Sequence, residues 1–502
     1  MKKAIIIGSG FGGLSTAGIL GKAGYEVLVL EKNEQIGGRA SKIEENGYTF
    51  DMGPSWYLMP EIFEHYFELL GEKISDYLTL EKLAPSYRIF FKDNKRFEVP
   101  LDIFSDLEKS LKVFEEIEPG VTPNFYKFLD ESTFKYEVSL RSFLYKNYDS
   151  VLDFINADTI KHGARLNIFK KMQPYVEKYF KTTEMQKIMQ YTLVFLGSSP
   201  YNTPAIYSVM THVDFRGGVF FPKGGMWSLV DALGKVCTKF GVKFRINSSV
   251  KKILVENGKA TGVELENGEI LKADIVVSNA DMHFTETKML EPENQTYNEK
   301  YWDKKVVTPS GFIMYLGVDG KLPMLDHHNF IFAPDWQKGF SEIFDDPKIP
   351  TDPSIYVSNV NKTDPSLAPE NKENLFILVP LAAGVDFTEE QKVEFGDKMI
   401  QLMSKEFGVP DLAERIEYKK YFMPQDFKDR YNSYRGAALG LAHTIMQTGY
   451  FRPNNYSKKV KNLYYVGHFT NPGTGVPMCM ISGELVYKRI IGDKSGKALK
   501  NV

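Results

Sequence analysis

Six residues near the N-terminus have the types and spacing of a loop that binds the pyrophosphate of a dinucleotide. They are Gly8-Ser9-Gly10-Phe11-Gly12-Gly13. In such a loop Gly8 permits a tight turn and Gly10 lets the backbone approach the pyrophosphate, whereas Gly13 allows helix and strand to pack closely. The phosphates then lie at the N-terminus of a helix, where free amides and the helix dipole favour negative charge.

The elements on either side of this loop must position it, and their patterns are those of a βαβ unit. Residues 3–7 and 26–30 are short apolar runs typical of buried parallel strands. Residues 14–23 between them have a helical pattern that ends at Gly24. Glu31 follows the second strand, where a carboxylate can accept hydrogen bonds from a ribose diol. Because an acidic residue here disfavours a 2′-phosphate, the unit predicts FAD or NAD rather than NADP.

A second pair of glycines favours FAD over NAD. The segment Ile36-Gly37-Gly38-Arg39 comes soon after Glu31, and Phe50-Asp51-Met52-Gly53-Pro54-Ser55-Trp56 follows it. The glycines permit close backbone approach, and the arginine supplies a cation beside the phosphates and the flavin. An NAD dehydrogenase has no need of this extension. The alternative interpretation is a surface turn with a solvated arginine.

The composition excludes several classes of protein. Lys and Arg total 62 against 64 Asp and Glu, so the chain lacks the basic excess of a nucleic-acid binder. Hydrophobic residues make up 43% and charged residues 25%, as in globular rather than disordered proteins. Two cysteines cannot form a disulfide framework. The adjacent His327 and His328 would point to opposite faces of a strand, so no metal site is predicted.

Further strand patterns are spread along the chain, which predicts interleaved rather than consecutive domains. Most of 60–180 is expected to be helical. Strands are expected at 242–246, 250–256, 260–265, 270–277, 311–333, 374–383 and 462–466, with a loop at 343–372 and a last helix from Val476. Asn-Gly pairs at 257–258 and 267–268 predict hairpin turns. The predicted domains are a dinucleotide-binding domain of 1–80, 220–290 and 455–502, a helical region of 81–219, and a substrate domain of 291–454.

These motifs resemble, in the same order from end to end, those of the FAD-containing amine oxidase and carotenoid desaturase superfamily. The glycine loop, Gly37-Gly38-Arg39 and the turn at Val466-Gly467 carry the wider resemblance. A narrower resemblance, to the bacterial phytoene desaturase family, is carried by residues 51–55, 197–208, 218–226 and 472–477. It implies an α/β fold in which a Rossmann-type FAD domain, similar to that of flavin-disulfide reductases, is interleaved with a mixed-sheet substrate domain and a helical, membrane-facing region.

The resemblance also implies which residues bind FAD. Gly8, Gly10, Gly13 and Glu31 would hold pyrophosphate and ribose, with Gly38 and Arg39 beside the phosphates and flavin. The backbone of Val250 would pair with the adenine. The other implied contacts are Gly53, Pro54, Ser55, Gly467, Gly475, Val476, Pro477 and Met478. His468 departs from the small residue of many relatives, and it either touches the flavin or fills space.

The implied activity is desaturation of a carotenoid, with phytoene as the expected substrate. An allylic C–H is too weak an acid for a side chain to ionise first, so hydride transfer to flavin N5 is expected to precede loss of a proton. No catalytic side chain is identified, and a quinone or oxygen is the expected electron acceptor. The alternatives are a carotene cis–trans isomerase, a retinoid-saturase-like enzyme, a flavin amine oxidase and a non-enzymatic FAD-binding escort protein.

Several segments bear on a substrate that resides in a bilayer. Aromatic residues, 14% of the chain, recur at 190–221 and 301–332, where they either line an apolar tunnel or belong to the core. Residues 166–180 have the pattern of an amphipathic helix with lysines, which lies either at a membrane interface or on the core. No apolar run is long enough to span a bilayer, so a cytoplasmic protein peripheral on the membrane is expected. His212 and Asp214 could form a polar site in the tunnel.

Overall fold

The computed structural model describes residues 1–93, 97, 99–155 and 157–502. The predicted βαβ unit forms the centre of a five-stranded parallel sheet with the strand order β19-β13-β1-β2-β9. Its strands are β1 (Lys3–Ile7), β2 (Glu26–Leu30), β9 (Lys243–Arg245), β13 (Ile275–Ser278) and β19 (Leu463–Tyr465). β1 and β13 are buried apolar runs because helices and loops cover both faces of a parallel sheet.

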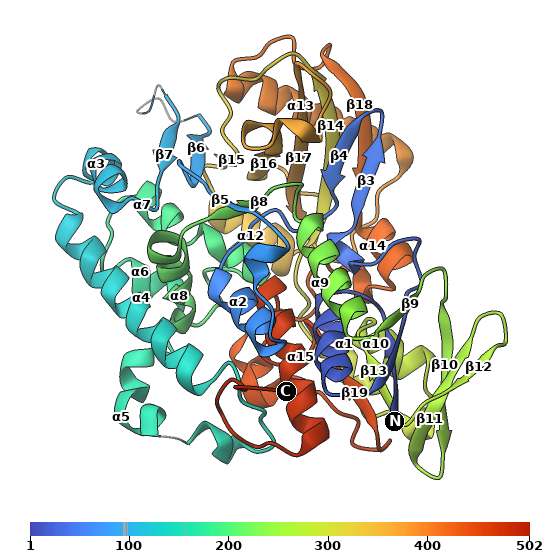
Figure 1. Ribbon diagram of the computed structural model, residues 1–502. Coiled ribbons are helices and arrows are strands. Elements are labelled where there is room, and N and C mark those ends of the chain that lie inside the picture. The colour runs from blue at the N-terminus through green and yellow to red at the C-terminus, as the bar shows by residue number, and fades with distance from the viewer. Residues whose placement is uncertain (94–96, 98, 156) are drawn as a thin grey trace.

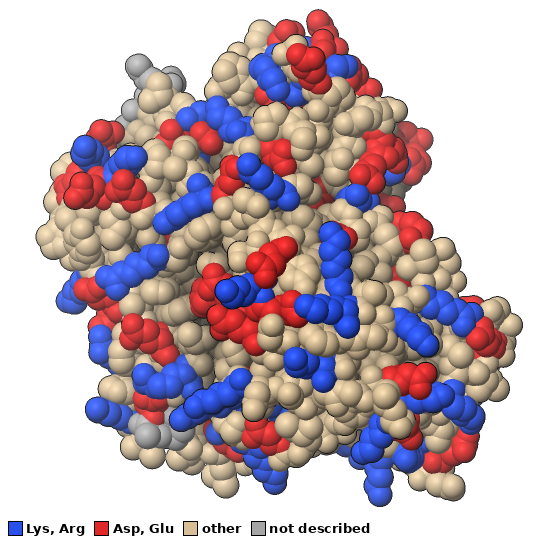
Figure 2. Space-filling model, in the orientation of Figure 1, with Lys and Arg blue, Asp and Glu red and all other residues tan. Residues whose placement is uncertain are grey.

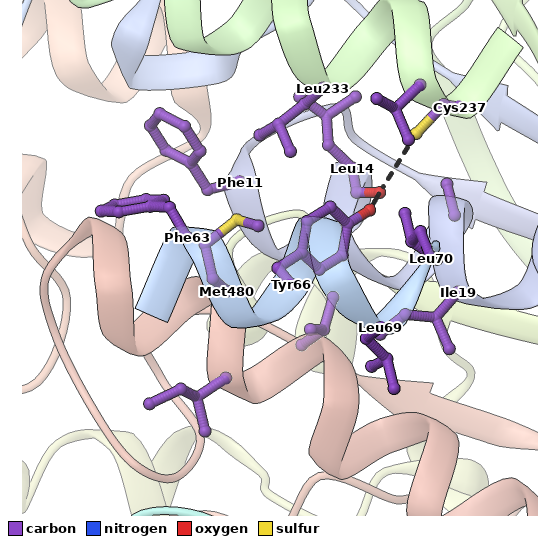
Figure 3. Packing of buried hydrophobic residues seen from close by; sticks show 14 of the residues in the cluster. Phe11, Leu14, Ile19, Phe63, Tyr66, Leu69, Leu70, Leu233, Cys237 and Met480 are labelled. Carbon is purple, nitrogen blue, oxygen red and sulfur yellow. Dashed lines mark hydrogen bonds between the residues drawn. The ribbon is translucent and has the colours of Figure 1, made fainter. Parts of the chain in front are cut away.

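One helix layer of this sheet is built around the helix that follows the glycine loop. α1 (Phe11–Lys22) packs against both α9 (Trp227–Lys239) and α15 (Val476–Ile491). α2 (Pro60–Leu69) joins this core, where the Tyr66 hydroxyl occupies the space that a side chain at Gly18 would fill. Figure 3 shows Leu14 of α1, Tyr66 of α2, Cys237 of α9 and Met480 of α15 converging there. Segments far apart in sequence therefore hold the N-terminus of α1 in place.

A second sheet of seven strands forms the other half of the molecule. Its order is β18-β14-β17-β16-β15-β6-β7, and the β15–β6 pair is parallel while the other pairs are antiparallel. The strands are β6 (Tyr87–Phe91), β7 (Leu101–Ile103), β14 (Ser310–Asp319), β15 (His328–Phe332), β16 (Ile355–Asn359), β17 (Lys372–Leu381) and β18 (Ile416–Phe422). α13 (Glu389–Phe407) covers one face (Figure 1).

Helices fill the space beside the second sheet and the cavity described below. They are α3 (Leu107–Ile117), α4 (Thr122–Ser142), α5 (Ala157–Leu166), α6 (Met172–Val176), α7 (Thr183–Ile188) and α8 (Val209–His212). In Figure 1 they form the side of the molecule away from the parallel sheet, with α5 at one end. On the face shown in Figure 2, positive and negative side chains are interspersed rather than gathered into areas of one sign.

The remaining elements are short. The small sheets are β10 (Val250–Glu256), β11 (Lys259–Leu265) and β12 (Ile270–Lys272), then β3 (Lys42–Glu45) with β4 (Tyr48–Asp51), and β5 (Leu80–Lys82) with β8 (Phe220–Pro222). The remaining helices are α10 (Met282–Lys288), α11 (Glu299–Trp302), α12 (Trp336–Phe344) and α14 (Pro424–Tyr431). The predicted hairpin turn at 257–258 is confirmed, since Asn257 and Gly258 both have positive φ between β10 and β11.

The mixed α/β class is confirmed, but three local predictions were wrong. β16 lies inside the predicted loop of 343–372, because its pairing with both β15 and β17 is long-range. The predicted strand of 270–277 is divided between β12 and β13, which belong to different sheets. The predicted strand of 242–246 is confirmed as β9, which is an edge strand of the parallel sheet. The helical prediction for 60–180 missed β5, β6 and β7.

Candidate functional site

A cavity of about 1110 Å³ lies between the two large sheets. Its lining includes the glycine loop and the carboxyl ends of β1, β2 and β13 at one end, and apolar side chains from α4, α5 and the second sheet at the other. All of the predicted cofactor-binding residues line it except Gly13 and Gly467, which lie directly behind the lining. The structure therefore brings together residues from positions 8 to 478 in one continuous space.

The glycine loop has the backbone geometry that its sequence predicts. Gly8 has a φ of +91°, which favours glycine over residues with a side chain. A Cβ on Gly13 would lie 2.2 Å from the Gly8 carbonyl oxygen, and one on Gly10 would lie 2.8 Å from Asn279 Oδ1. Gly10 is the N-cap of α1 and provides no side-chain cap, so the first amides of the helix are available to an anion.

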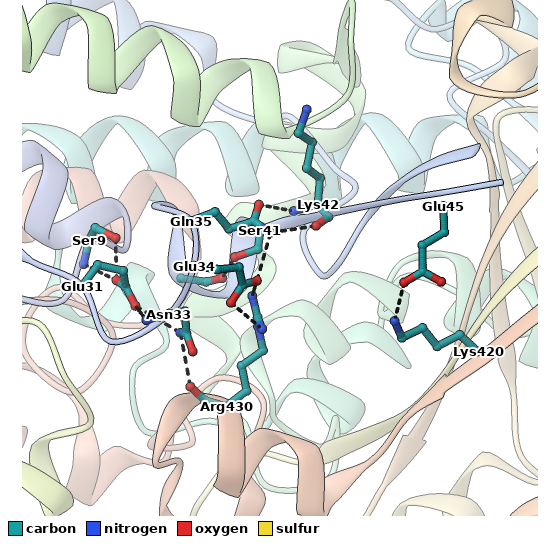
Figure 4. A network of polar contacts seen from close by, with 11 residues as sticks. Ser9, Glu31, Asn33, Glu34, Gln35, Ser41, Lys42, Glu45, Lys420 and Arg430 are labelled. Atoms are coloured by element: carbon teal, nitrogen blue, oxygen red, sulfur yellow. Dashed lines mark hydrogen bonds and ion pairs between the residues drawn. The ribbon is translucent and has the colours of Figure 1, made fainter. Parts of the chain in front are cut away.

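Glu31 is only 5% exposed and is held by the residues around it. Its Oε2 accepts hydrogen bonds from the Ser9 amide at 2.9 Å and the Ser9 hydroxyl at 2.5 Å. Its Oε1 accepts from the amide and side chain of Asn33 at 2.9 and 3.1 Å (Figure 4). A carboxylate has about four acceptor positions, and these four hydrogen bonds fill them, so a bound ribose diol would share or replace a Ser9 or Asn33 contact. The Ser9 and Asn33 contacts hold the Glu31 carboxylate at the edge of the cavity.

Arg39 is a half-buried cation beside the cavity. Its Nη2 donates to Ser433 Oγ at 3.1 Å, and its guanidinium lies 5.2 Å from the centre of the Tyr431 ring. Among the described residues its Nε has no hydrogen-bond partner. Desolvation lowers the pKa of Arg39, and the nearby Asp281 carboxylate offsets this only in part. A bound diphosphate would supply the missing acceptor and the opposite charge.

The C-terminal turn completes this end of the cavity. Gly467 has a φ of +104°, and a Cβ there would lie 2.6 Å from Asn279 Nδ2. The Gly467 amide donates to Ser482 Oγ at 2.9 Å. Gly475 is the N-cap of α15, so this helix also directs its N-terminus at the cavity. His468 lines the cavity, and its Nε2 has no hydrogen-bond partner in the described part of the chain.

Sequence reasoning missed several residues of this end. Asn279 donates to the Val466 carbonyl at 3.1 Å, and buried Asp281 accepts from the Tyr434 amide at 2.9 Å. Both follow β13, and their position at the carboxyl end of a parallel strand is the signal that could have identified them. Arg430 and Asn432 line the cavity from α14 and its C-cap. They come from the second half of the molecule, and no local motif marks them.

The other end of the cavity is apolar. Its lining consists of aliphatic and aromatic side chains, namely Trp56, Tyr136, Phe143, Leu144, Tyr148, Leu196, Ile206, Tyr207, Met210, Ile313, Phe376 and Leu378. The sequence prediction of an apolar tunnel is only partly met, since Tyr191, Phe215, Phe312 and Tyr315 belong to the core. The carboxylates that line the cavity are Glu31 and Asp281, and both lie at the dinucleotide end.

Exposed apolar residues surround the apolar end, and we call them the mouth patch. They are Val151, Leu152, Ile155, Ile160, Phe169, Ile445, Met446 and Phe451. Phe169 is 85% and Ile160 is 77% exposed, and both also line the cavity. No helix in the described ranges of the chain is long and apolar enough to cross a membrane.

Two predictions near the apolar end were wrong. Residues 166–180 form no continuous helix, because α5 ends at Leu166 and the apolar residues that follow, Met172 to Phe180, pack in the core. Phe169, in the same segment, is exposed instead. His212 and Asp214 form no shared site, since they lie on helical turns rather than a strand: His212 contacts Thr133, whereas Asp214 accepts from two tyrosines.

The histidine pair is structural. His328 Nδ1 lies 2.7 Å from the Tyr356 hydroxyl, and His327 Nδ1 lies 2.6 Å from the Thr363 hydroxyl. Burial lowers the pKa of both imidazoles. Across the described residues, no group of three His, Cys, Asp or Glu is arranged to hold a metal ion.

Comparison with known proteins is consistent with this site. Residues 11–491 match the model of the flavin-containing amine oxidoreductase family. The chain is 43% identical to a carotenoid 3,4-desaturase of Haloarcula japonica, over 97% of this chain and 98% of the relative. It is 35% identical to a zeta-carotene-forming phytoene desaturase of Myxococcus xanthus, over 98% and 94% of the two chains. A solved putrescine oxidase shares the fold, with a TM-score of 0.63 at 12% identity over 98% of this chain and 99% of that one.

These matches extend over nearly the whole chain, and they include the elements that form both ends of the cavity. The glycine loop, the half-buried Arg39 and the two helix N-termini fit a flavin dinucleotide, so FAD is the cofactor. The chain belongs to the flavin-containing amine oxidoreductase family, among the relatives that include the carotenoid desaturases.

Proposed function

We propose that this protein is an FAD-dependent carotenoid desaturase, which introduces C=C bonds into a long apolar polyene. The observation that supports it most is the continuity of one cavity from a dinucleotide-binding loop to an apolar space that contains no lining carboxylate among the described residues. A small polar amine would find no counter-ion in that space, whereas a hydrocarbon needs none. The curated relatives with high identity carry carotenoid desaturase names.

The residues of the dinucleotide end would hold FAD. The amides after Gly10 and the Arg39 guanidinium would bind the diphosphate, Glu31 would bind the ribose, and the backbone at Val250 would face the adenine. Gly53, Pro54 and Ser55, together with Gly475 to Met478, would enclose the flavin, with Gly467 behind them. Bound FAD supplies a two-electron acceptor that takes hydride from an allylic carbon. The protein excludes water and orients the chain of the substrate.

We further propose that the mouth patch docks on a lipid bilayer, from which the substrate enters. Its eight apolar side chains are exposed around the apolar end of the cavity. Lys161, Arg165, Lys170 and Lys171 are exposed beside them, as expected for a surface that meets anionic headgroups. A polyene that leaves the bilayer through this patch would pass from one apolar phase to another without crossing water.

Substrate turnover tests the proposal. FAD-loaded protein would be mixed, without oxygen, with a quinone and liposomes that contain either phytoene or an already conjugated acyclic carotene. The visible spectrum would be followed over time. We expect polyene bands to move to longer wavelength with at least one of these substrates, and the final position counts the new double bonds. No change with either substrate, while FAD is bound, would contradict desaturation; a parallel reaction under oxygen identifies the acceptor.

A further inference from the structure

His443 lies where the two ends of the cavity meet. It lines the cavity, is buried, and contacts both sides of the junction. Its backbone amide donates to Ser198 Oγ at 3.0 Å, and its ring lies edge-on to Tyr207 at 5.2 Å on the apolar side. Its Nδ1 lies 3.3 Å from the hydroxyl of Thr474, which precedes α15 on the flavin side. The imidazole is therefore next to the place where a polyene would meet a flavin.

The hydrogen bonds of His443 define its tautomer. Nδ1 lies 3.1 Å from the Leu196 carbonyl oxygen, which can only accept a hydrogen bond. Nδ1 must therefore carry the proton, and Nε2 carries a lone pair. A Cβ at Gly473 would come within 2.3 Å of Nε2, so a glycine at this position leaves the room in which the lone pair lies. Burial and the nearby Arg452 lower the pKa of His443 to about 3, which keeps the imidazole neutral.

Other groups around the junction are less suited to accept a proton. The carboxylates that line the cavity lie at the dinucleotide end. The lining hydroxyls of Tyr207 and Tyr356 are held as phenols, because burial raises their pKa. His468 lies nearer the cofactor-side cations, and burial together with Arg39 and Arg452 lowers its pKa well below the usual value. Among the described residues, His443 is the lining base that combines a fixed tautomer with contacts on the apolar side.

We propose that His443 Nε2 accepts the proton that completes each double bond. This inference rests on the proposed desaturase function. Transfer of a hydride from one carbon of the –CH2–CH2– unit to the bound flavin would leave an allylic cation, because both electrons of the broken C–H bond leave with the hydride. The C–H bond on the adjacent carbon then breaks, its proton binds the Nε2 lone pair, and its electron pair becomes the new π bond. Because His443 is a weak base, it releases this proton again before the next turnover.

His443→Asn tests the role directly. The Asn amide can still donate to the Leu196 carbonyl, but it has no basic nitrogen at the position of Nε2. We expect unchanged FAD content and substrate affinity, with the single-turnover rate of C=C formation reduced by about 10²–10⁴-fold, the usual contribution of a general base. His327→Asn is the matched control, since His327 is a buried histidine outside the cavity that bonds to Thr363. It should keep the full rate.

Two further measurements separate catalysis from positioning. In His443→Ala, added imidazole should restore the rate at least tenfold, because a diffusible base can occupy the vacated space. The ¹⁵N shifts of His443 in the unmodified protein should show a protonated Nδ1 and an unprotonated Nε2. A rate within about threefold of wild type in His443→Asn, no rescue by imidazole, or a protonated Nε2 would overturn the inference. Absence of desaturation by the wild type would instead contradict the proposed function.

Discussion

The dinucleotide end and the apolar end of the cavity are built from different kinds of structural detail. At the dinucleotide end, positions such as Gly13 admit one residue type, because a Cβ would meet the backbone. At the apolar end, the lining comes from exchangeable aliphatic and aromatic side chains on α4, α5 and the second sheet. A clash with the backbone cannot be relieved by a side-chain movement, whereas hydrophobic packing tolerates substitution by side chains of similar volume. The difference shows how one fold can keep a cofactor while its substrate space changes.

The largest effect is expected from a substitution of Gly13, at the dinucleotide end of the cavity. Gly13→Ala places a methyl group 2.2 Å from the Gly8 carbonyl oxygen, which is backbone and cannot move aside cheaply. We expect FAD binding to be lost, together with substantial destabilisation, as measured by flavin absorbance and thermal unfolding. Gly339→Ala is the control, because this helical glycine has open space around it. Normal FAD occupancy in Gly13→Ala would show that the loop is not as constrained as described.

A smaller loss is expected at Arg39. Arg39→Met removes the cation that would pair with the diphosphate but keeps most of the side-chain volume. Hydrogen bonds to charged groups contribute about 1.5–3 kcal/mol, so FAD affinity should fall about 10–100-fold. Fluorescence titration of the apoprotein with FAD measures this. Arg435→Met removes an arginine that faces Asp303 instead, and its affinity should match wild type; equal affinity in both variants would remove Arg39 from the site.

At the apolar end, polar substitutions in the mouth patch should weaken binding to membranes and leave FAD binding unchanged. The double variant Ile160→Ser with Phe169→Ser removes two of its most exposed apolar side chains. We expect binding to anionic liposomes to fall about tenfold or more, since burying such a side chain contributes about 1.5–3 kcal/mol. Flotation assays measure it, with Val393→Ser on α13 as an exposed apolar control. Undiminished flotation would contradict docking through this patch.

The smallest effect concerns a carboxyl group beneath the apolar end. Asp214 is buried, accepts from the hydroxyls of Tyr87 and Tyr191, and has a pKa raised by burial to about 7. In the unfolded chain its pKa is about 4. Between pH 4 and 7 the unfolded state therefore binds fewer protons, and stability falls as pH rises. Asp214→Asn should remove this contribution to the pH dependence of stability. The Tm difference between pH 5 and 7 should then change by a few °C. An unchanged Tm difference would show that Asp214 is ionised in the folded protein.

The contrast between the two ends of the cavity also explains which site residues could be predicted from sequence. The dinucleotide loop, Glu31, Arg39 and the C-terminal turn each leave a local signature, because the backbone there restricts residue types. Arg430 and His443 lie at the cavity through long-range packing, and nothing near them in sequence marks that position. Asn279 was missed although it directly follows a parallel strand. The amphipathic pattern of 166–180 predicted one helix wrongly. Such a pattern also cannot distinguish a face packed on the core from a face at a membrane, because both have the same periodicity.

We propose that one continuous cavity places a polyene against the bound flavin. A single turnover without any electron acceptor tests this most directly. FAD-loaded protein would be mixed anaerobically with carotene-loaded liposomes while the flavin and polyene absorbance are recorded together. We predict that the oxidised-flavin band bleaches while the polyene bands move to longer wavelength, with one new double bond for each flavin reduced. Flavin that stays oxidised while the polyene is unchanged would contradict the account.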